Sequence, residues 1–443
     1  SSLRYVSESI PMFHEAGARF YNASFGNDWG CVGPGVYLAA RILWDLNEAG
    51  RSREIMRDFL DRAFGPAAGT MEAFYGMIDG DHNPLLSEDL IGRMYRHLER
   101  ALQKTGDEPL IRARLLDLVR YTRYVDLYFV FSNASDDRRQ ESFENLMTYV
   151  HSISDIGMAN FRLANMMLPR RNPEMSLPEG DNWRRAASPT DGETLDILSS
   201  GIAKNQPFNF QPVAFSDNLV PAATVLTLDA GMKSGHFGGY PARVRKTIYT
   251  WIEEPGEVIL KVAGNPGRRG TTTSEIALFS PEEVTVEAVD RFKGVLTSDE
   301  HTIVLKTPYR GMHWLEAHGP SFKIAFADPS MPKTVPAGTH AVNRYHIWSL
   351  YFYVPKGTST IGGFASTPRG HMLDGDGVRR FAFDQLAGPG YYSVQVPTGQ
   401  DGRLWMLNGV RGTQLLLTVP PYLAATAADL LLPEEVCERD TAR

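Results

Sequence analysis

The stretch Ala18–Asp45, ARFYNASFGNDWGCVGPGVYLAARILWD, decides how the first part of the chain is interpreted. Its opening residues are rich in aromatic side chains and predict a strand. A polar loop follows, and the apolar spacing of Leu38, Ile42 and Leu43 then predicts a helix. A second apolar segment, FLDRAFGPAAGTMEAFYGMID, occupies Phe59–Asp79. This order is typical of the last strand of a (β/α)8 barrel that leads into its closing helix.

The same passage resembles an uncharacterised bacterial family, a domain of unknown function allied to alpha-glucuronidases and other glycoside hydrolases. In that family an aromatic strand, a loop, a YLAARILWD-type helix and an FGPAA turn follow in this order, and the resemblance covers roughly residues 10–165. It implies that the chain is the C-terminal portion of a secreted or periplasmic glycoside hydrolase-like protein. The parent protein would act on or bind a polysaccharide, including one that contains uronic acids.

In such a barrel the reacting groups lie at the carboxyl ends of the strands and on the loops that follow. This rule makes Asp28 the candidate catalytic residue, and Asn22, Asn27 and Trp29 the candidate substrate-binding residues. Alternatively, Asp28 only caps the following helix and Trp29 only fills the barrel mouth. Glycoside hydrolysis normally requires two carboxyl groups, and the resemblance implies that earlier barrel strands supply the main acid and base. Whether the parent protein is an enzyme therefore stays open.

A long polar connection carries a second candidate for substrate binding. The segment Pro178–Pro189, PEGDNWRRAASP, places Trp183 beside Arg184. An aromatic ring with an adjacent guanidinium suits a carboxylated sugar, because arginine can hold a carboxylate with two parallel hydrogen bonds. The alternative is a strap that packs its own side chains between domains.

Composition bounds the remaining functions. The chain of 443 residues has a net charge of -7, so it lacks the basic excess that nucleic-acid binding needs. It contains no apolar run long enough to span a bilayer, so we expect no membrane partner. Cys31 and Cys437 are the only cysteines, which excludes a disulfide framework. We expect no cofactor and no metal, because neither Asp79–His82 nor the turn with Asp374 and Asp376 matches a known metal loop.

The apolar period changes along the chain from 3.6 to two, which predicts a multidomain α+β protein. The expected parts are a terminal βα unit of a TIM-like barrel, a helical domain and two tandem antiparallel β-sandwiches. The predicted boundaries are 1–33 for the closing strand and loop, 34–167 for the helical domain, 168–207 for a linker with a short helix, 208–335 for the first sandwich and 336–435 for the second.

The two sandwiches are predicted from an internal repeat. YTWIEEPG, which begins at Tyr249, is echoed by YFYVPKG, which begins at Tyr351, and further on Trp314 pairs with Trp405. A period of about 90–100 residues is the size of one small sandwich. The repeat also bears a loose likeness to the jelly-roll accessory modules of secreted bacterial hydrolases. Two other functions stay open: a non-catalytic carbohydrate-binding or scaffold protein, and a polysaccharide lyase.

Overall fold

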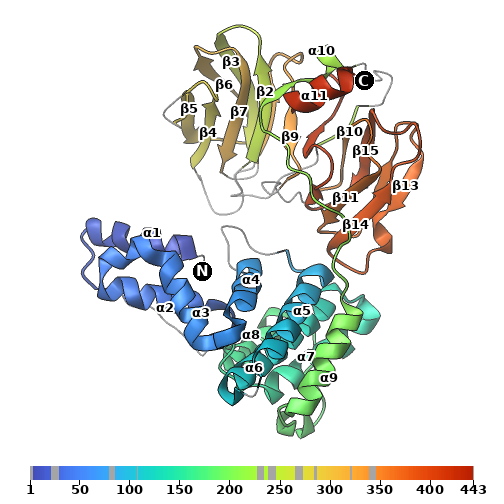
Figure 1. Cartoon of the computed structure of the whole chain (residues 1–443). Coiled ribbons are helices and arrows are strands. Elements are labelled where there is room, and N and C mark those ends of the chain that lie inside the picture. Colours follow the sequence, from blue (N-terminus) through green and yellow to red (C-terminus); the bar gives the residue numbers. More distant parts are fainter. Residues whose placement is uncertain are drawn as a thin grey trace. The chain divides into compact units, whose positions relative to one another are not determined.

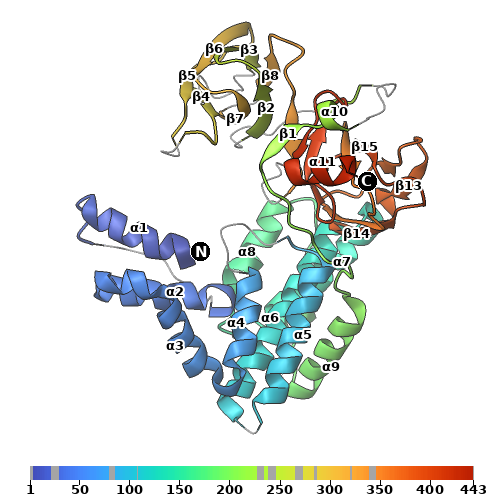
Figure 2. The same ribbon diagram turned by 45° about the horizontal axis from the view of Figure 1, so that its top comes forward.

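The structure is a computed structural model that describes residues 3–20, 29–78, 85–106, 108–226, 234–237, 246–264, 273–283, 287–319, 322–338 and 346–442. The chain divides into two compact units, Ser1–Pro207 and Phe208–Arg443. The first unit is helical and the second is built of antiparallel sheets (Figure 1 and Figure 2). The predicted helical region and the predicted β-rich region are both confirmed.

The helical unit consists of α-helices joined by short 3-10 turns. They are α1 (Leu3–Glu15), α2 (Trp29–Trp44), η1 (Leu46–Arg51), α3 (Ser52–Phe64), η2 (Gly65–Ala67), α4 (Ala68–Ile78), α5 (Glu88–Lys104), α6 (Pro109–Asn133), α7 (Asp136–Ser152), α8 (Phe161–Arg171), η3 (Asn182–Arg185) and α9 (Asp191–Lys204). None of the described helices is long and apolar enough to cross a membrane.

Helix α9 is fixed tightly against α5 and α6. Its first turn is closed by a capping box between Thr190 and Glu193. At the other end Gly201 lies so close to the Tyr95 ring that a methyl group there would clash. The buried carboxylate of Asp126 on α6 accepts hydrogen bonds from Arg123 at 2.7 Å and from Lys204 of α9 at 2.8 Å. This pairing satisfies a charge that burial would otherwise penalise.

The expected barrel strand is not settled by the structure. Residues 18–20 have no regular structure and residues 21–28 lie outside the described part of the chain. Helix α2 begins at Trp29, so it crosses the predicted boundary between residues 33 and 34. The physical reason is that the loop before α8 caps this helix from outside. The backbone N–H groups of Trp29 and Gly30 donate to the carbonyls of Gly157 and Met158 at 3.1 and 2.8 Å.

The β-rich unit contains three antiparallel sheets and a two-stranded ribbon within the described residues. Its elements are β1 (Leu219–Pro221), α10 (Ala222–Val225), β2 (Lys246–Ile252), β3 (Gly256–Gly264), β4 (Thr273–Phe279), β5 (Asp290–Val295), β6 (Glu300–Thr307), β7 (Gly311–His318), β8 (Phe322–Phe326), β9 (Thr334–Pro336), β10 (Trp348–Val354), β11 (Thr360–Ala365), β12 (His371–Leu373), β13 (Arg379–Ala382), η4 (Phe383–Gln385), β14 (Gly390–Gln395), β15 (Arg403–Val410), β16 (Gln414–Leu416), β17 (Tyr422–Ala424), β18 (Leu431–Pro433) and α11 (Glu434–Thr441).

A duplicated strand plan organises this unit. The largest sheet has the order β13-β12-β15-β10-β17-β9-β2-β7-β4-β5, and the two small sheets have the orders β6-β3-β8 and β14-β11-β16. Adding eight to each strand number from β2 to β9 gives the strands β10 to β17, and every described pairing within β2–β9 has its counterpart within β10–β17. The ribbon of β1 and β18 stands outside this repeat. The halves meet where β9 pairs with β17, with Val335 opposite Leu423. They are therefore not separate tandem sandwiches, because one sheet and one hydrophobic core run through both.

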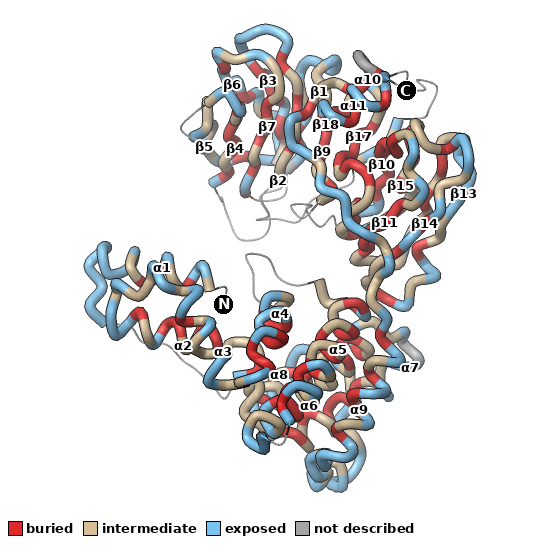
Figure 3. The backbone as a smooth tube through the Cα atoms, in the orientation of Figure 1, coloured by how far each residue is buried: buried red, intermediate tan, exposed pale blue. Residues whose placement is uncertain are grey.

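Strand β10 shows how this sheet is covered on both faces. It is buried along its whole length, which Figure 3 shows as a continuous buried run. Leu350 and Phe352 face the shared core. Tyr351 and Tyr353 face a second cluster, which β18 and α11 form on the outer side of the sheet. A strand buried on two faces loses the simple alternation of apolar and polar residues.

The strand register corrects the predicted tryptophan pair. Tyr249 and Tyr351 occupy equivalent places, as the repeat predicts, since each faces the central β9–β17 pair. Opposite them across the next strand lie Trp314 and Met406, so Trp405 is one residue out of step with Trp314. The predicted equivalence of the two indoles is wrong. Because side chains alternate along a strand, an offset of one residue places them on opposite faces.

The two indoles give a matched pair for testing this register. We expect Trp405→Ala to lower the free energy of unfolding of the β-rich unit by about 3–5 kcal/mol, because it empties a fully buried site. It also removes the hydrogen bond that the indole nitrogen donates to the Gln400 carbonyl at 2.8 Å. Trp314→Ala serves as the control and costs much less, since that ring is only half-buried and stacks on Phe279.

Hydrogen exchange of the amides in β7, β10 and β15 measures this loss in the β-rich unit apart from the helical unit. Equal losses for the two variants would contradict the assignment of the indoles to opposite faces.

Candidate functional site

A cavity of about 610 Å³ lies within the helical unit and is called the aromatic pocket here. Its walls come from the start of α2, from α6, from the first turn of α7 and from α8. The lining residues are Cys31, Val32, Tyr121, Tyr124, Tyr128, Phe131, Ser132, Arg139, Ala159, Asn160, Phe161, Leu163, Ala164, Met167, Leu168, Arg171 and Asn172. The volume is within the range of small-molecule sites.

One face of α6 supplies the aromatic wall. Tyr121, Tyr124, Tyr128 and Phe131 follow at steps of three, four and three residues, which places them on one side of the helix. The ring of Tyr124 meets that of Phe161 edge to face, with centroids 5.4 Å apart. The result is a row of four rings, of which Tyr128 is 38% exposed and Phe131, at the end of the row, is buried.

The hydroxyls of Tyr121 and Tyr124 stay protonated at neutral pH. Burial raises the pKa of Tyr121, with a further contribution from the neighbouring Cys31 thiol. Burial also raises the pKa of Tyr124, beside Tyr128. Within the described residues the hydroxyls of Tyr124 and Tyr128 have no hydrogen-bond partner. Both hydroxyls can therefore donate a hydrogen bond to a ligand or accept one from it.

Two arginines supply positive charge at the opposite wall. The guanidinium of Arg139 lies over the Phe131 ring, 5.2 Å from its centroid, and 3.7 Å from the carboxylate of Glu174. Its Nε atom is buried without a hydrogen-bond partner. Arg171 is the last residue of α8, is exposed and forms no ion pair with the described residues. No aspartate or glutamate is among the residues that line the pocket in the described part of the chain.

The structure places the predicted site residues elsewhere or leaves them undescribed. Asn22, Asn27 and Asp28 lie outside the described residues, so their roles stay predictions. Trp29 is the first residue of α2 and is 49% exposed. It precedes the pocket residue Cys31 by two positions but does not itself line the pocket.

Trp183 and Arg184 do contact one another on η3, between α8 and α9. The guanidinium lies 4.9 Å from the indole centroid. It is also paired with the Asp181 carboxylate at 2.6 Å, so an acid of the chain already occupies it. The indole meets the ring of His151 on α7 edge to face, at 5.4 Å. This geometry fits a packed strap, and neither residue lines the aromatic pocket.

Sequence reasoning missed the residues that build the pocket. The signal was the run YTRYVDLYFVF, which starts at Tyr121 and carries aromatic residues at helical spacing. Such a stripe is more often core than site. The cavity beside this stripe is seen only in the structure, where residues of other helices, Arg139 and Arg171 among them, form its opposite wall.

The acidic turn between β12 and β13 is accounted for without a metal. Asp374 accepts a hydrogen bond from Arg380 at 2.6 Å, and Asp376 is paired with Arg403 at 2.8 Å. The Arg403 and Gln400 side chains lower the pKa of Asp376. In the described part of the chain, no three or more His, Cys, Asp or Glu side chains lie together in a group that could hold a metal ion.

Comparison with protein-family models and with curated proteins found no match to this chain. The resemblance to the family allied to alpha-glucuronidases therefore stays a prediction that these comparisons do not test.

The two cysteines provide a test of the pocket wall. Cys31 is half-buried in the aromatic pocket, whereas Cys437 is buried beneath the outer face of the β-rich unit. Burial raises the pKa of the Cys437 thiol to about 11, so little thiolate forms there at pH 8. We expect a thiol reagent to modify one cysteine rapidly in the native chain, and Cys31→Ser to abolish that reaction. Peptide mapping identifies the site, and rapid modification of Cys437 would contradict the assignment.

Proposed function

We propose that the helical unit binds a carboxylated sugar, such as a uronic acid of a polysaccharide, in the aromatic pocket. The observation that carries this proposal is the combination of a row of tyrosines with two arginines and no lining acid in the described residues. Aromatic rings offer flat apolar faces with polar edges, which suits a sugar ring that has an apolar face and a hydroxylated rim. A guanidinium can hold the carboxylate of a uronic acid with paired hydrogen bonds.

The same features support binding rather than catalysis at this pocket. Glycoside hydrolysis needs a carboxylic acid and a carboxylate across the bond, and no acid is among the lining residues that the structure describes. Elimination by a lyase needs a base that removes a proton. The raised pKa values of Tyr121 and Tyr124 make both tyrosines poor bases at neutral pH. The non-catalytic alternative is therefore favoured over the lyase for this pocket.

We expect Arg171→Gln to weaken the binding of glucuronate-containing oligosaccharides about tenfold or more, because a hydrogen bond to a charged group contributes roughly 1.5–3 kcal/mol. Arg170→Gln is the matched control: the residue is adjacent and exposed, the charge change is the same, and it does not line the pocket. Isothermal titration calorimetry measures both affinities. A ligand bound in the aromatic pocket should also slow the modification of Cys31 by a thiol reagent, and this protection would show where the ligand binds. An equal loss of affinity in both variants would show that only the net charge of the chain matters, and would contradict a specific role of Arg171.

We further propose that residues 1–33 close a (β/α)8 barrel whose other strands are supplied from outside these 443 residues. Large apolar side chains exposed around the first two helices support this: Phe20 is 97% and Trp44 93% exposed. Such residues are typical of surfaces that pack against further protein. The complete protein would then be a secreted or periplasmic glycoside hydrolase-like protein, with Asp28 at the mouth of the barrel.

In a protein with the complete barrel, we expect Asp28→Ala to lower kcat on uronic-acid-containing substrates about 100-fold or more with an unchanged Tm, as for loss of a general acid or base. The 443-residue chain alone should bind such glycans without hydrolysing them. Reducing-end assays and thermal denaturation provide the measurements. A lowered Tm with normal kcat would show that Asp28 is only a helix cap.

A further inference from the structure

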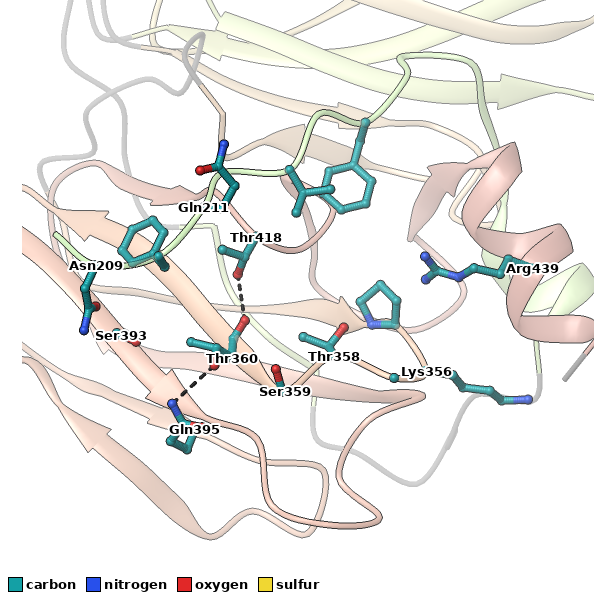
Figure 4. Close-up of a pocket in the computed structure, with 15 residues that line it drawn as sticks. Asn209, Gln211, Lys356, Thr358, Ser359, Thr360, Ser393, Gln395, Thr418 and Arg439 are labelled. Carbon is teal, nitrogen blue, oxygen red and sulfur yellow. Dashed lines mark hydrogen bonds between the residues drawn. The ribbon is translucent and has the colours of Figure 1, made fainter.

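A second cavity, of about 580 Å³, lies within the β-rich unit (Figure 4) and is called the polar groove here. It is bounded by the segment before β1, the turn between β10 and β11, strand β14 and the end of α11. The lining residues are Asn209, Phe210, Gln211, Val213, Phe215, Pro355, Lys356, Gly357, Thr358, Ser359, Thr360, Ser393, Gln395, Thr418 and Arg439.

One wall of the polar groove is an extended segment that the sheet holds in place. The Val213 N–H donates to the Leu417 carbonyl at 2.7 Å. The Phe208 and Phe210 rings stack with centroids 4.5 Å apart. Phe210 in turn lies against Gly362 of β11, so close that a Cβ there would approach its ring to 2.5 Å. A glycine at this strand position lets the segment lie against the sheet and complete the groove.

The base of the groove is a closed set of hydrogen bonds around Thr360 (Figure 4). Its hydroxyl accepts from the Gln395 amide at 3.2 Å, and its carbonyl accepts from the Thr418 hydroxyl at 2.9 Å. The Thr418 hydroxyl also accepts from the Gly362 N–H at 2.7 Å. These bonds fix the orientation of the groups beneath a ligand.

Around this base stand five polar side chains that have no hydrogen-bond partner among the described residues. They are Asn209, Gln211, Thr358, Ser359 and Ser393. Two are amides and three are hydroxyls, so the set offers both donors and acceptors. None of them carries charge.

The two basic residues at the groove are both hydrogen-bonded to Asp440. The ammonium of Lys356 donates to the backbone carbonyl of Asp440 at 2.6 Å. Arg439 Nε donates to the buried carboxylate of Asp440 at 2.9 Å. The Asp440 carboxylate therefore balances the charge of Arg439, whereas the backbone carbonyl holds the Lys356 ammonium in place without neutralising it. The five open side chains of the groove are neutral.

From this arrangement we propose that the polar groove binds a neutral oligosaccharide. Many neutral donors and acceptors beside two phenylalanine rings match a chain of uncharged sugar rings. An extended peptide is the less favoured occupant, because peptides added to a sheet are bound through main-chain hydrogen bonds at an edge. Here the groove is lined by the Ser393 and Gln395 side chains on one face of β14. The inference stands on this groove alone and does not depend on the aromatic pocket.

The test uses the full chain and titration calorimetry with cellohexaose, xylohexaose and mannohexaose, against hexagalacturonate as the charged probe. Ser393→Tyr fills the groove at an exposed strand position where tyrosine is well tolerated, and should weaken neutral binding at least tenfold. Asn209→Ala with Gln211→Ala should weaken it severalfold. Gln385→Ala, an exposed amide on η4 that does not line the groove, is the matched control and should have no effect.

Arg171→Gln separates this inference from the proposed function. That variant should keep neutral binding in full, whatever its effect on uronates. The inference is overturned if no neutral hexasaccharide binds at millimolar concentration, or if Ser393→Tyr binds as the parent chain does. It is also overturned if Arg171→Gln abolishes the neutral binding, or if hexagalacturonate or an extended peptide competes for the groove more strongly than the neutral sugars.

Discussion

The pairing of β9 with β17 is the constraint on which the β-rich unit depends. Each of these strands has only three residues, yet together they join two duplicated halves into one sheet. Two separate sandwiches would each present an open edge at this point, and open edges invite pairing with other chains. Joining edge to edge removes both liabilities and makes the core continuous. The outer face then needs a cover at the junction, and β18 with α11 provides it through residues such as Leu431 and Val436.

That cover also positions the polar groove. Because α11 lies on the outer face beside β10, its Asp440 reaches the Tyr353 hydroxyl at 3.0 Å and the Lys356 N–H at 2.7 Å. These bonds hold the turn that carries Thr358 and Ser359. The groove therefore depends on α11, which covers the sheet where the two halves join. It lies in the second half of the repeat, where the segment before β1 packs against β11.

Sequence periodicity predicted the change from helices to strands near residue 208 because it reports which face of an element is buried. The sequence repeat correctly paired Tyr249 with Tyr351, which lie at equivalent places on either side of the β9–β17 pair. It mismatched Trp314 with Trp405, since identical letters outweighed a register that only the hydrogen bonds define. The aromatic pocket could not be predicted in this way, because its other walls come from α2, α7 and α8, and only tertiary packing brings these helices to the α6 stripe. The barrel strand stays a prediction, as residues 21–28 lie outside the described part.

Charge explains why the aromatic pocket would bind an acidic sugar and the polar groove a neutral one. The chain carries a net charge of -7, so a long anionic polymer is repelled at a distance, although salt at physiological strength screens this within about 8 Å. An acidic sugar must therefore be held by charge at contact, which is where Arg139 and Arg171 lie. Arg171 forms no ion pair with the described residues, whereas Asp440 already pairs with Arg439. Each cavity thus has one arginine beside an acid of the chain, Arg139 beside Glu174 and Arg439 beside Asp440. The aromatic pocket has in addition Arg171, which would be the cation available to the carboxylate of an acidic sugar.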